Sequence, residues 1–292
     1  MKHLLWTSTS LACLAFSVSL PLGALAADVL PSQLPAVSDI NGKIEFSGGV
    51  QDMSGVDSYG AFRGGASLSI PVGDLFGIQA DLAVADVNNT AMYGGTLHAF
   101  TRDPENYLFG VAGGAAFSDN ASIGYVGPEV ELYLGQVSLE AFAGYMNVNL
   151  DGVGAQDKFF AIGDLAFYAT DNLRLSIGAS DIADFTSGHA GLEWQIDNVG
   201  LPLSLTADAK FGENDFYSVA AGVKFYFGGS DKSLIRRHRE DDPRNRSLDI
   251  FSAAGSAFTP GKSGPNYGTC PSTSEIDIDP GPGLNCVPRD TG

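Results

Sequence analysis

Three side chains in residues 187–193 have the types that hydrolytic enzymes use. Ser187, His189 and Glu193 would serve as nucleophile, general base and orienting acid. In a strand they share one face, where successive residues of that face lie about 6.6–7 Å apart at their Cα atoms. That spacing is too long for a direct relay from Ser to His within one strand. We therefore expect no enzyme, and a lipid-modifying enzyme is the last of the alternatives.

The other residue types that could do chemistry predict no metal, no cofactor and no nucleic acid. Glu275, Asp277 and Asp279 alternate, but they lack the glycine and the terminal glutamate of a calcium loop. Gly113 and Gly114 lie in an expected strand with no helix after it, so they do not form a phosphate loop. The formal net charge of −18 argues against nucleic acid, because phosphate binding needs clustered Lys and Arg.

The chain begins with the features of a secretory signal peptide. A basic start at Lys2 and an apolar stretch precede the small-x-small pattern at residues 24–26. We predict a signal peptide over residues 1–26 and a lead-in over residues 27–41. Cleavage of the signal peptide removes Cys13 and leaves Cys270 and Cys286, which we expect to form a disulfide in an oxidising compartment.

From about residue 43 to residue 227, apolar residues alternate with polar or small ones. A period of two indicates strands with two unlike faces. We predict twelve strands, which begin near residues 43, 59, 76, 91, 107, 122, 137, 158, 173, 187, 201 and 216. Tight connections alternate with longer, more polar ones, such as residues 51–58 and 181–186. This is the pattern of a closed antiparallel transmembrane β-barrel.

Charged residues within the strands lie on the face opposite the apolar series. A soluble barrel has the opposite arrangement, with apolar side chains inside and charges outside. Lipid would cover the apolar face without a second packed layer, and closure would leave no free edge. A secreted lipocalin-like barrel or a sandwich is the alternative. We predict that the lumen is lined by Lys43, Glu45, Arg63, Asp81, Glu129, Glu131, Glu140, Asp164, Arg174, Glu193, Asp208, Lys210 and Lys224.

The signal peptide, the twelve segments and the last strand, residues 223–227, resemble Gram-negative outer-membrane β-barrel proteins of the small porin-like group. The resemblance covers about residues 41–229 and implies an all-β transmembrane barrel over residues 42–229 in the cell outer membrane. It implies outer-membrane lipid and lipopolysaccharide as partners. It also implies that barrel-assembly machinery reads Phe225 and Phe227 as an assembly signal. With an even strand count, both termini and the lead-in would be periplasmic.

Composition changes after Gly229. Residues 230–292 carry a basic run from Lys232 to Arg246 and then many Gly, Pro and Ser, with few large apolar groups. Such a segment cannot build its own core. We expect a periplasmic tail that either is solvated or contacts a periplasmic partner, the peptidoglycan layer or the barrel mouth.

Together these features predict a narrow porin-like channel for small hydrophilic solutes. The acidic excess in its lumen and loops predicts a preference for cations, because rings of carboxylates bias pores toward them. One alternative is a non-conducting structural or ligand-binding barrel of the cell envelope. The second is the outer-membrane lipid-modifying enzyme named above.

Overall fold

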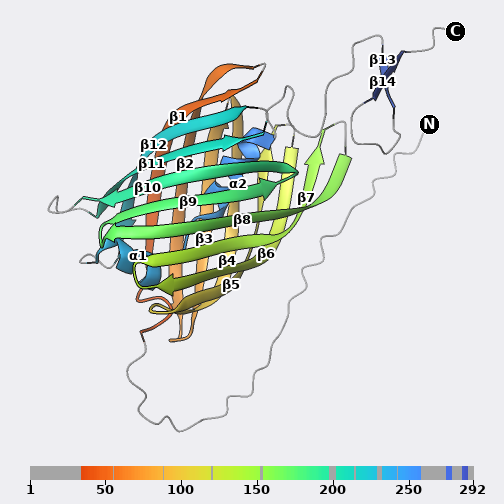
Figure 1. Cartoon of the computed structure of the whole chain (residues 1–292). Helices are drawn as coiled ribbons and strands as arrows, with labels where there is room; N and C mark the ends of the chain where they lie inside the picture. The colour runs from red at the N-terminus through yellow and green to blue at the C-terminus, as the bar shows by residue number, and fades with distance from the viewer. Residues whose placement is uncertain are drawn as a thin grey trace, which may run out of the picture. The chain divides into compact units, whose positions relative to one another are not determined.

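Twelve antiparallel strands form a closed barrel in this computed structural model (Figure 1). β1 closes the ring by pairing with β12, which sets Gly42 opposite Phe227 and Asp52 opposite Tyr217. The predicted closed twelve-stranded barrel is therefore confirmed. The strands are β1 Asn41–Met53, β2 Val56–Val72, β3 Phe76–Val87, β4 Thr90–Asp103, β5 Tyr107–Ser118, β6 Ala121–Leu134, β7 Val137–Leu150, β8 Gly154–Thr170, β9 Leu173–Ile182, β10 Phe185–Gln195, β11 Leu203–Gly212 and β12 Phe216–Phe227.

Beyond the barrel, a small antiparallel sheet pairs β13 (Ser274–Asp277) with β14 (Asn285–Pro288). The structure describes residues 34–54, 56–87, 89–119, 121–151, 154–196, 202–213, 215–228, 232–241, 243–257, 274–277 and 285–288. The predicted signal peptide and Cys270 lie outside the described residues, whereas Cys286 lies in β14, so the disulfide between Cys270 and Cys286 stays a prediction.

By the strand bounds, ten of the eleven connections are two or three residues long, and the one between β10 and β11 spans residues 196–202. We call the end that holds Asn41 and Phe227 the terminal end and the opposite end the far end. Gly73 and Gly135, in terminal-end turns, have φ values of +63° and +62°, which glycine adopts without a steric cost. The prediction of longer loops at residues 51–58 and 181–186 is wrong. Those residues continue the paired strands up to tight turns, because the ladder satisfies their backbone groups whatever the side chains.

The outer surface of the barrel is apolar. In β3, exposed and buried residues alternate strictly, so Leu82 faces outward with 66% of its side chain exposed while Asp81 and Ala83 face inward. The closed ladder leaves no free edge, and such a surface suits hydrocarbon. Aromatic residues near strand ends are typical of interfacial girdles. Three aromatic residues near the far ends of their strands, Tyr59, Phe185 and Phe216, are buried inside the barrel and so do not belong to such a girdle.

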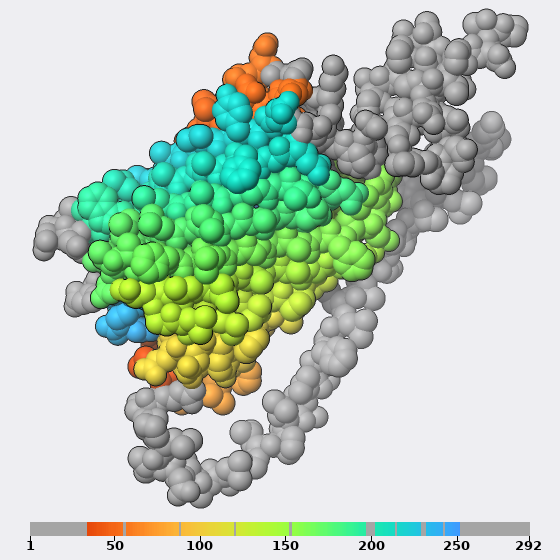
Figure 2. Space-filling view, viewed as in Figure 1, coloured from red at the N-terminus to blue at the C-terminus, as the bar shows by residue number. Residues whose placement is uncertain are grey.

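Two helices come after the barrel in the chain. α1 (Leu234–Glu240) lies at one end of the ring, and α2 (Arg246–Ala257) lies inside it, where it contacts β2 to β5, β9 and β10 (Figure 1). In the space-filling view α1 is visible at that end (Figure 2). Of the alternatives expected for the tail, contact with the barrel mouth describes α1, while residues 243–251 lie deeper, within the lumen, which the sequence did not lead us to expect. The basic run finds acidic partners in the wall, and Ile250 and Phe251 find apolar ones.

No helix in the described parts of the chain is both long and apolar enough to cross a membrane.

A charge on the outer face tests the orientation of the strands. Leu82→Arg should destabilise the folded barrel by about 2–4 kcal/mol, because it places a cation in hydrocarbon near mid-strand. The matched change Leu75→Arg, in a terminal-end turn, should cost about 0–1 kcal/mol. Urea unfolding in lipid vesicles measures both. Equal losses at the two positions would contradict a lipid-facing Leu82.

Candidate functional site

One segment of the chain occupies the lumen. We call residues 232–251 the plug segment. At the terminal end, the backbone N–H of Leu234 donates to Asn172 Oδ1 at 3.0 Å. Further inside, the backbone N–H of Arg246 donates to Asp81 Oδ2 at 2.8 Å. The plug segment therefore runs from the mouth into the interior.

The N-terminal lead-in closes the same mouth. Arg102 Nε donates to the carbonyl of Ala36 at 2.6 Å, and its Nη2 donates to the carbonyl of Asp241 at 2.6 Å. Ser38 donates to Asp241 Oδ1 at 2.5 Å. Arg102 was missed as a lumen residue because the sequence pattern placed it in a turn.

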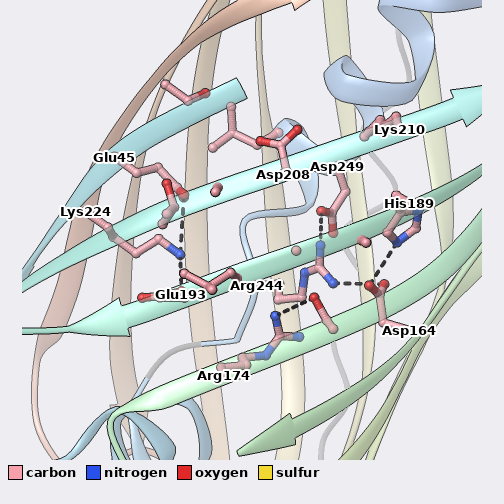
Figure 3. Close-up of a pocket in the computed structure, with 18 of the residues that line it drawn as sticks. Glu45, Asp164, Arg174, His189, Glu193, Asp208, Lys210, Lys224, Arg244 and Asp249 are labelled. Carbon is pink, nitrogen blue, oxygen red and sulfur yellow. Dashed lines mark hydrogen bonds and ion pairs between the residues drawn. The ribbon is translucent and has the colours of Figure 1, made fainter. Parts of the chain in front are cut away.

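Arg244 is the centre of the first ion-pair cluster. Its guanidinium lies 2.8 Å from Asp164, 3.3 Å from Glu140 and 2.7 Å from Asp249 (Figure 3). Arg174 of the wall shares Glu140, at 2.8 Å. Burial alone would lower the pKa of Arg244, but these carboxylates raise it well above its usual range. The plug segment is therefore held to β7 and β8 by charge.

Arg246 anchors the opposite side of the plug segment. Its side chain is fully buried, with Nε 3.5 Å from Glu129 Oε2. His98 lies between Glu129 and Asp81, with each ring nitrogen 2.9 Å from a carboxylate oxygen. Asp81 also accepts the backbone N–H of Arg246. This second cluster ties the start of α2 to β3, β4 and β6.

A third contact holds α1 at the mouth. The two ring nitrogens of His238 lie 2.8 and 2.9 Å from the hydroxyls of Tyr168 and Tyr226. Burial lowers the pKa of His238 well below its usual range, so the imidazole is neutral there. Glu193 accepts from Tyr226 at 2.6 Å and from Lys224 at 2.9 Å.

The inner face is apolar toward the far end, which the sequence reasoning did not anticipate. Inward residues of β4, β7 and β8 change from charged to apolar along each strand, and Ile250 and Phe251 of α2 pack on them. The Arg246 guanidinium lies 5.4 Å from the centre of the Phe142 ring, at the boundary of the two regions. This apolar cluster includes Met53, Tyr59, Val87, Met92, Ile123, Tyr125, Phe142, Met146, Val148, Phe160, Ile162, Ile182, Phe185 and Phe216.

A polar cavity of about 190 Å³ remains beside the plug segment (Figure 3). Side chains of β1, β2 and β8 to β12 line it, together with Arg244 and Asp249 of the plug segment. A second cavity of about 130 Å³ shares Glu45, Arg174 and Arg244 and extends to Lys43 and His238. The lumen is thus filled on the side of β3 to β6 and partly open on the other.

All thirteen charged residues assigned to the lumen face inward in the structure. The plug segment contacts Lys43, Asp81, Glu129, Glu140, Asp164 and Glu193 directly. Tyr133 donates to Glu131 at 2.9 Å. The cavity is lined by the rest of the set, Glu45, Arg63, Arg174, Asp208, Lys210 and Lys224.

The three residues considered for catalysis have separate partners. Ser187 bonds to Ser180 at 2.9 Å, and His189 Nε2 lies 2.9 Å from Asp164 Oδ1. Glu193 is engaged by Lys224 and Tyr226. The described contacts therefore do not join Ser187, His189 and Glu193 into a relay.

Removing a plug-to-wall contact should loosen the plug segment. Arg244→Ala should weaken its docking by about 2 kcal/mol, because a charged hydrogen-bond partner contributes about 1.5–3 kcal/mol. Arg236→Ala is the control, since Arg236 pairs with Glu240 of its own helix, is 56% exposed and should change docking by less than about 0.5 kcal/mol. Hydrogen exchange of residues 232–251 measures the difference. Equal protection in both variants would contradict the role of Arg244.

The barrel is similar to solved structures of other proteins whose sequences have low identity to this chain. No family model and no curated protein matches the chain. An outer-membrane channel from Pseudomonas putida F1 is 8% identical, with 69% of this chain and 100% of that chain covered and a TM-score of 0.49. The KdgM porin in complex with disordered oligogalacturonate is 9% identical, with 64% and 99% covered and a TM-score of 0.47. The NanC porin is 9% identical, with 62% and 98% covered and a TM-score of 0.46.

By its own closed ring, apolar outer surface and charged lumen, the chain has the fold of an outer-membrane β-barrel.

Proposed function

We propose that this protein is an outer-membrane channel for small hydrophilic solutes that its own plug segment closes. The observation that carries the proposal is the pairing of plug bases with wall acids, above all Arg244 with Glu140 and Asp164. Displacement of the plug segment would leave a lumen lined by charged side chains, which water would fill.

The chemistry of the wall favours a channel over a permanently sealed barrel. Buried ion pairs are often no more stabilising than apolar side chains of the same volume. In a lumen that never opens, apolar side chains of the same volume could replace Asp81, Glu129, Glu140, Asp164 and their basic partners without loss of stability. The same residues suit a lumen that is alternately filled by the plug segment and by water.

The docked plug segment accounts for a closed state. It occupies the side of β3 to β6, and Ile250 and Phe251 seal the far end against the apolar cluster. The remaining cavities of about 190 and 130 Å³ lie beside it. Conduction would require the plug segment to move.

Cation preference belongs to the barrel without its plug segment. The predicted lumen set holds eight acids and five bases, and Arg102 adds a sixth base. When docked, the plug segment brings Arg244 and Arg246 among these acids, with Asp249 between them, and so reduces the excess. We therefore propose that selectivity for cations appears only in the open state.

Placement in the outer membrane carries further proposals about partners. Phe225 and Phe227 face outward at the end of β12, with exposures of 40% and 44%. They are available to barrel-assembly machinery, and the apolar surface is available to outer-membrane lipid and lipopolysaccharide. Both termini would then face the periplasm, where residues beyond the plug segment could meet peptidoglycan or another partner.

A non-conducting barrel of the cell envelope is the second candidate. The packing of Ile250 and Phe251 in the apolar cluster favours it, since an apolar seal excludes water and ions. In that case the plug segment would act as a permanent core. Conductance separates the two candidates.

Planar-bilayer recording tests the proposed channel. The wild-type chain should be closed most of the time, and a double change, Arg244→Ala with Arg246→Ala, should raise the open fraction roughly tenfold or more, since ~1.4 kcal/mol of lost docking is tenfold. Arg236→Ala should behave as wild type. In a salt gradient, the reversal potential of the open variant should indicate cations.

If the protein is correctly folded and neither the wild type nor the double variant conducts in bilayers, the non-conducting barrel is favoured. An anion-selective reversal potential in the open variant would remove the cation preference alone.

A further inference from the structure

The cavity beside the plug segment holds cationic groups that lack close anionic partners. From these groups we propose that the cavity binds a small hydroxycarboxylate. This is a binding site of the closed state, since Arg244 and Asp249 of the docked plug segment line the cavity, and it is separate from the solute that the open channel would pass. The groups that carry it are Lys210, Asp208 and His189 (Figure 3), together with Arg63, which also lines the cavity.

Arg63 is a buried cation with an incomplete set of partners. Its side chain is 6% exposed and lines the cavity, and within the described structure its Nε makes no hydrogen bond. Its nearest carboxylate oxygen, Asp208 Oδ2, lies 4.0 Å away, beyond hydrogen-bond distance, and also makes no hydrogen bond. A buried charge without close partners is costly, so the position favours an anion that supplies them.

Lys210 adds a second cation to the same cavity. It lies on β11 beside His189 of β10 in the strand register. Asp208 is two residues away on the same face of β11, and of the other charges near Lys210, Arg244 and Asp249 already pair with each other. Arg63 and Lys210 therefore share Asp208 as the one nearby carboxylate without another described ion pair, and a ligand carboxylate would give both cations a close partner.

His189 indicates that the ligand also carries a hydroxyl. Its Nε2 is held by Asp164 at 2.9 Å, and its Nδ1 is buried without a partner among the described groups. A hydroxyl next to the ligand's carboxylate suits this nitrogen, because a hydroxyl can both donate and accept a hydrogen bond.

The size and access of the cavity restrict the ligand to a small solute. A cavity of about 150 Å³ holds benzene, and this one measures about 190 Å³. Asp208 is 35% exposed, so water reaches this part of the lumen. A three-carbon hydroxycarboxylate such as lactate fits these limits, whereas an acidic oligosaccharide does not.

Ligand-observed NMR titration of the full chain in detergent tests the site, with sodium lactate as probe and glycerol as the uncharged comparison. Lactate should saturate at a concentration at least tenfold below glycerol. Arg63→Met and Lys210→Met should each raise the dissociation constant for lactate about tenfold or more, as the loss of a charged hydrogen bond implies. Lys158→Met is the matched control, because Lys158 pairs with Asp184 and lies outside the cavity.

The Asp208→Asn variant distinguishes ligand binding from a purely structural role of Arg63 and Lys210. Because Asp208 competes with the lactate carboxylate for these two cations, its removal should tighten lactate binding several-fold. A heat-dependent gel shift establishes that each variant is folded. The proposal is overturned if lactate and glycerol bind alike, or if Asp208→Asn leaves the lactate affinity unchanged or weakens it. If lactate binds but neither the wild type nor the open variant conducts, the binding site stands and the proposed channel is rejected. If the open variant conducts but lactate does not bind, the channel stands and the binding site is rejected.

Discussion

Ion pairs between basic residues of the plug segment and acidic residues of the barrel wall determine how the lumen is filled. Arg244 and Arg246 reach carboxylates on β3, β6, β7 and β8 that would otherwise face one another or water. Because removing one partner of a buried ion pair leaves the other uncompensated, these contacts hold the plug segment in one position. They are also the contacts that water can replace.

The lumen therefore has two regions with different physical behaviour. The polar region at the terminal end is held by charge, while the apolar cluster at the far end is held by burial of Ile250, Phe251 and the wall residues around them. Ionic strength screens exposed charge pairs, but it screens buried pairs such as Arg246 with Glu129 much less. Both regions therefore hold the docked plug segment largely out of reach of salt.

The sequence predicted which charged residues of the strands face the lumen, but it did not predict which of them pair with one another. The alternation of Glu129 and Glu131 with apolar neighbours indicated which face of β6 meets the lumen. It carried no signal for the partner of each acid, since pairs such as Arg244 with Asp164 are distant along the chain. The inward Phe142 and Met146 lie on the same face of β7 as Glu140, and only α2 explains why they face the lumen.

The sequence by itself determined the strands and their two faces: a period of two over about twelve segments, with charges on one face, favours a closed ring whose apolar side meets lipid. Tertiary structure alone decided that residues 232–251 fill the lumen. Their composition is that of a solvated tail, and their stabilising partners include side chains of strands more than a hundred residues away, such as Asp81 and Glu129. Local pattern reports which face a residue occupies, whereas three-dimensional proximity decides which charges meet.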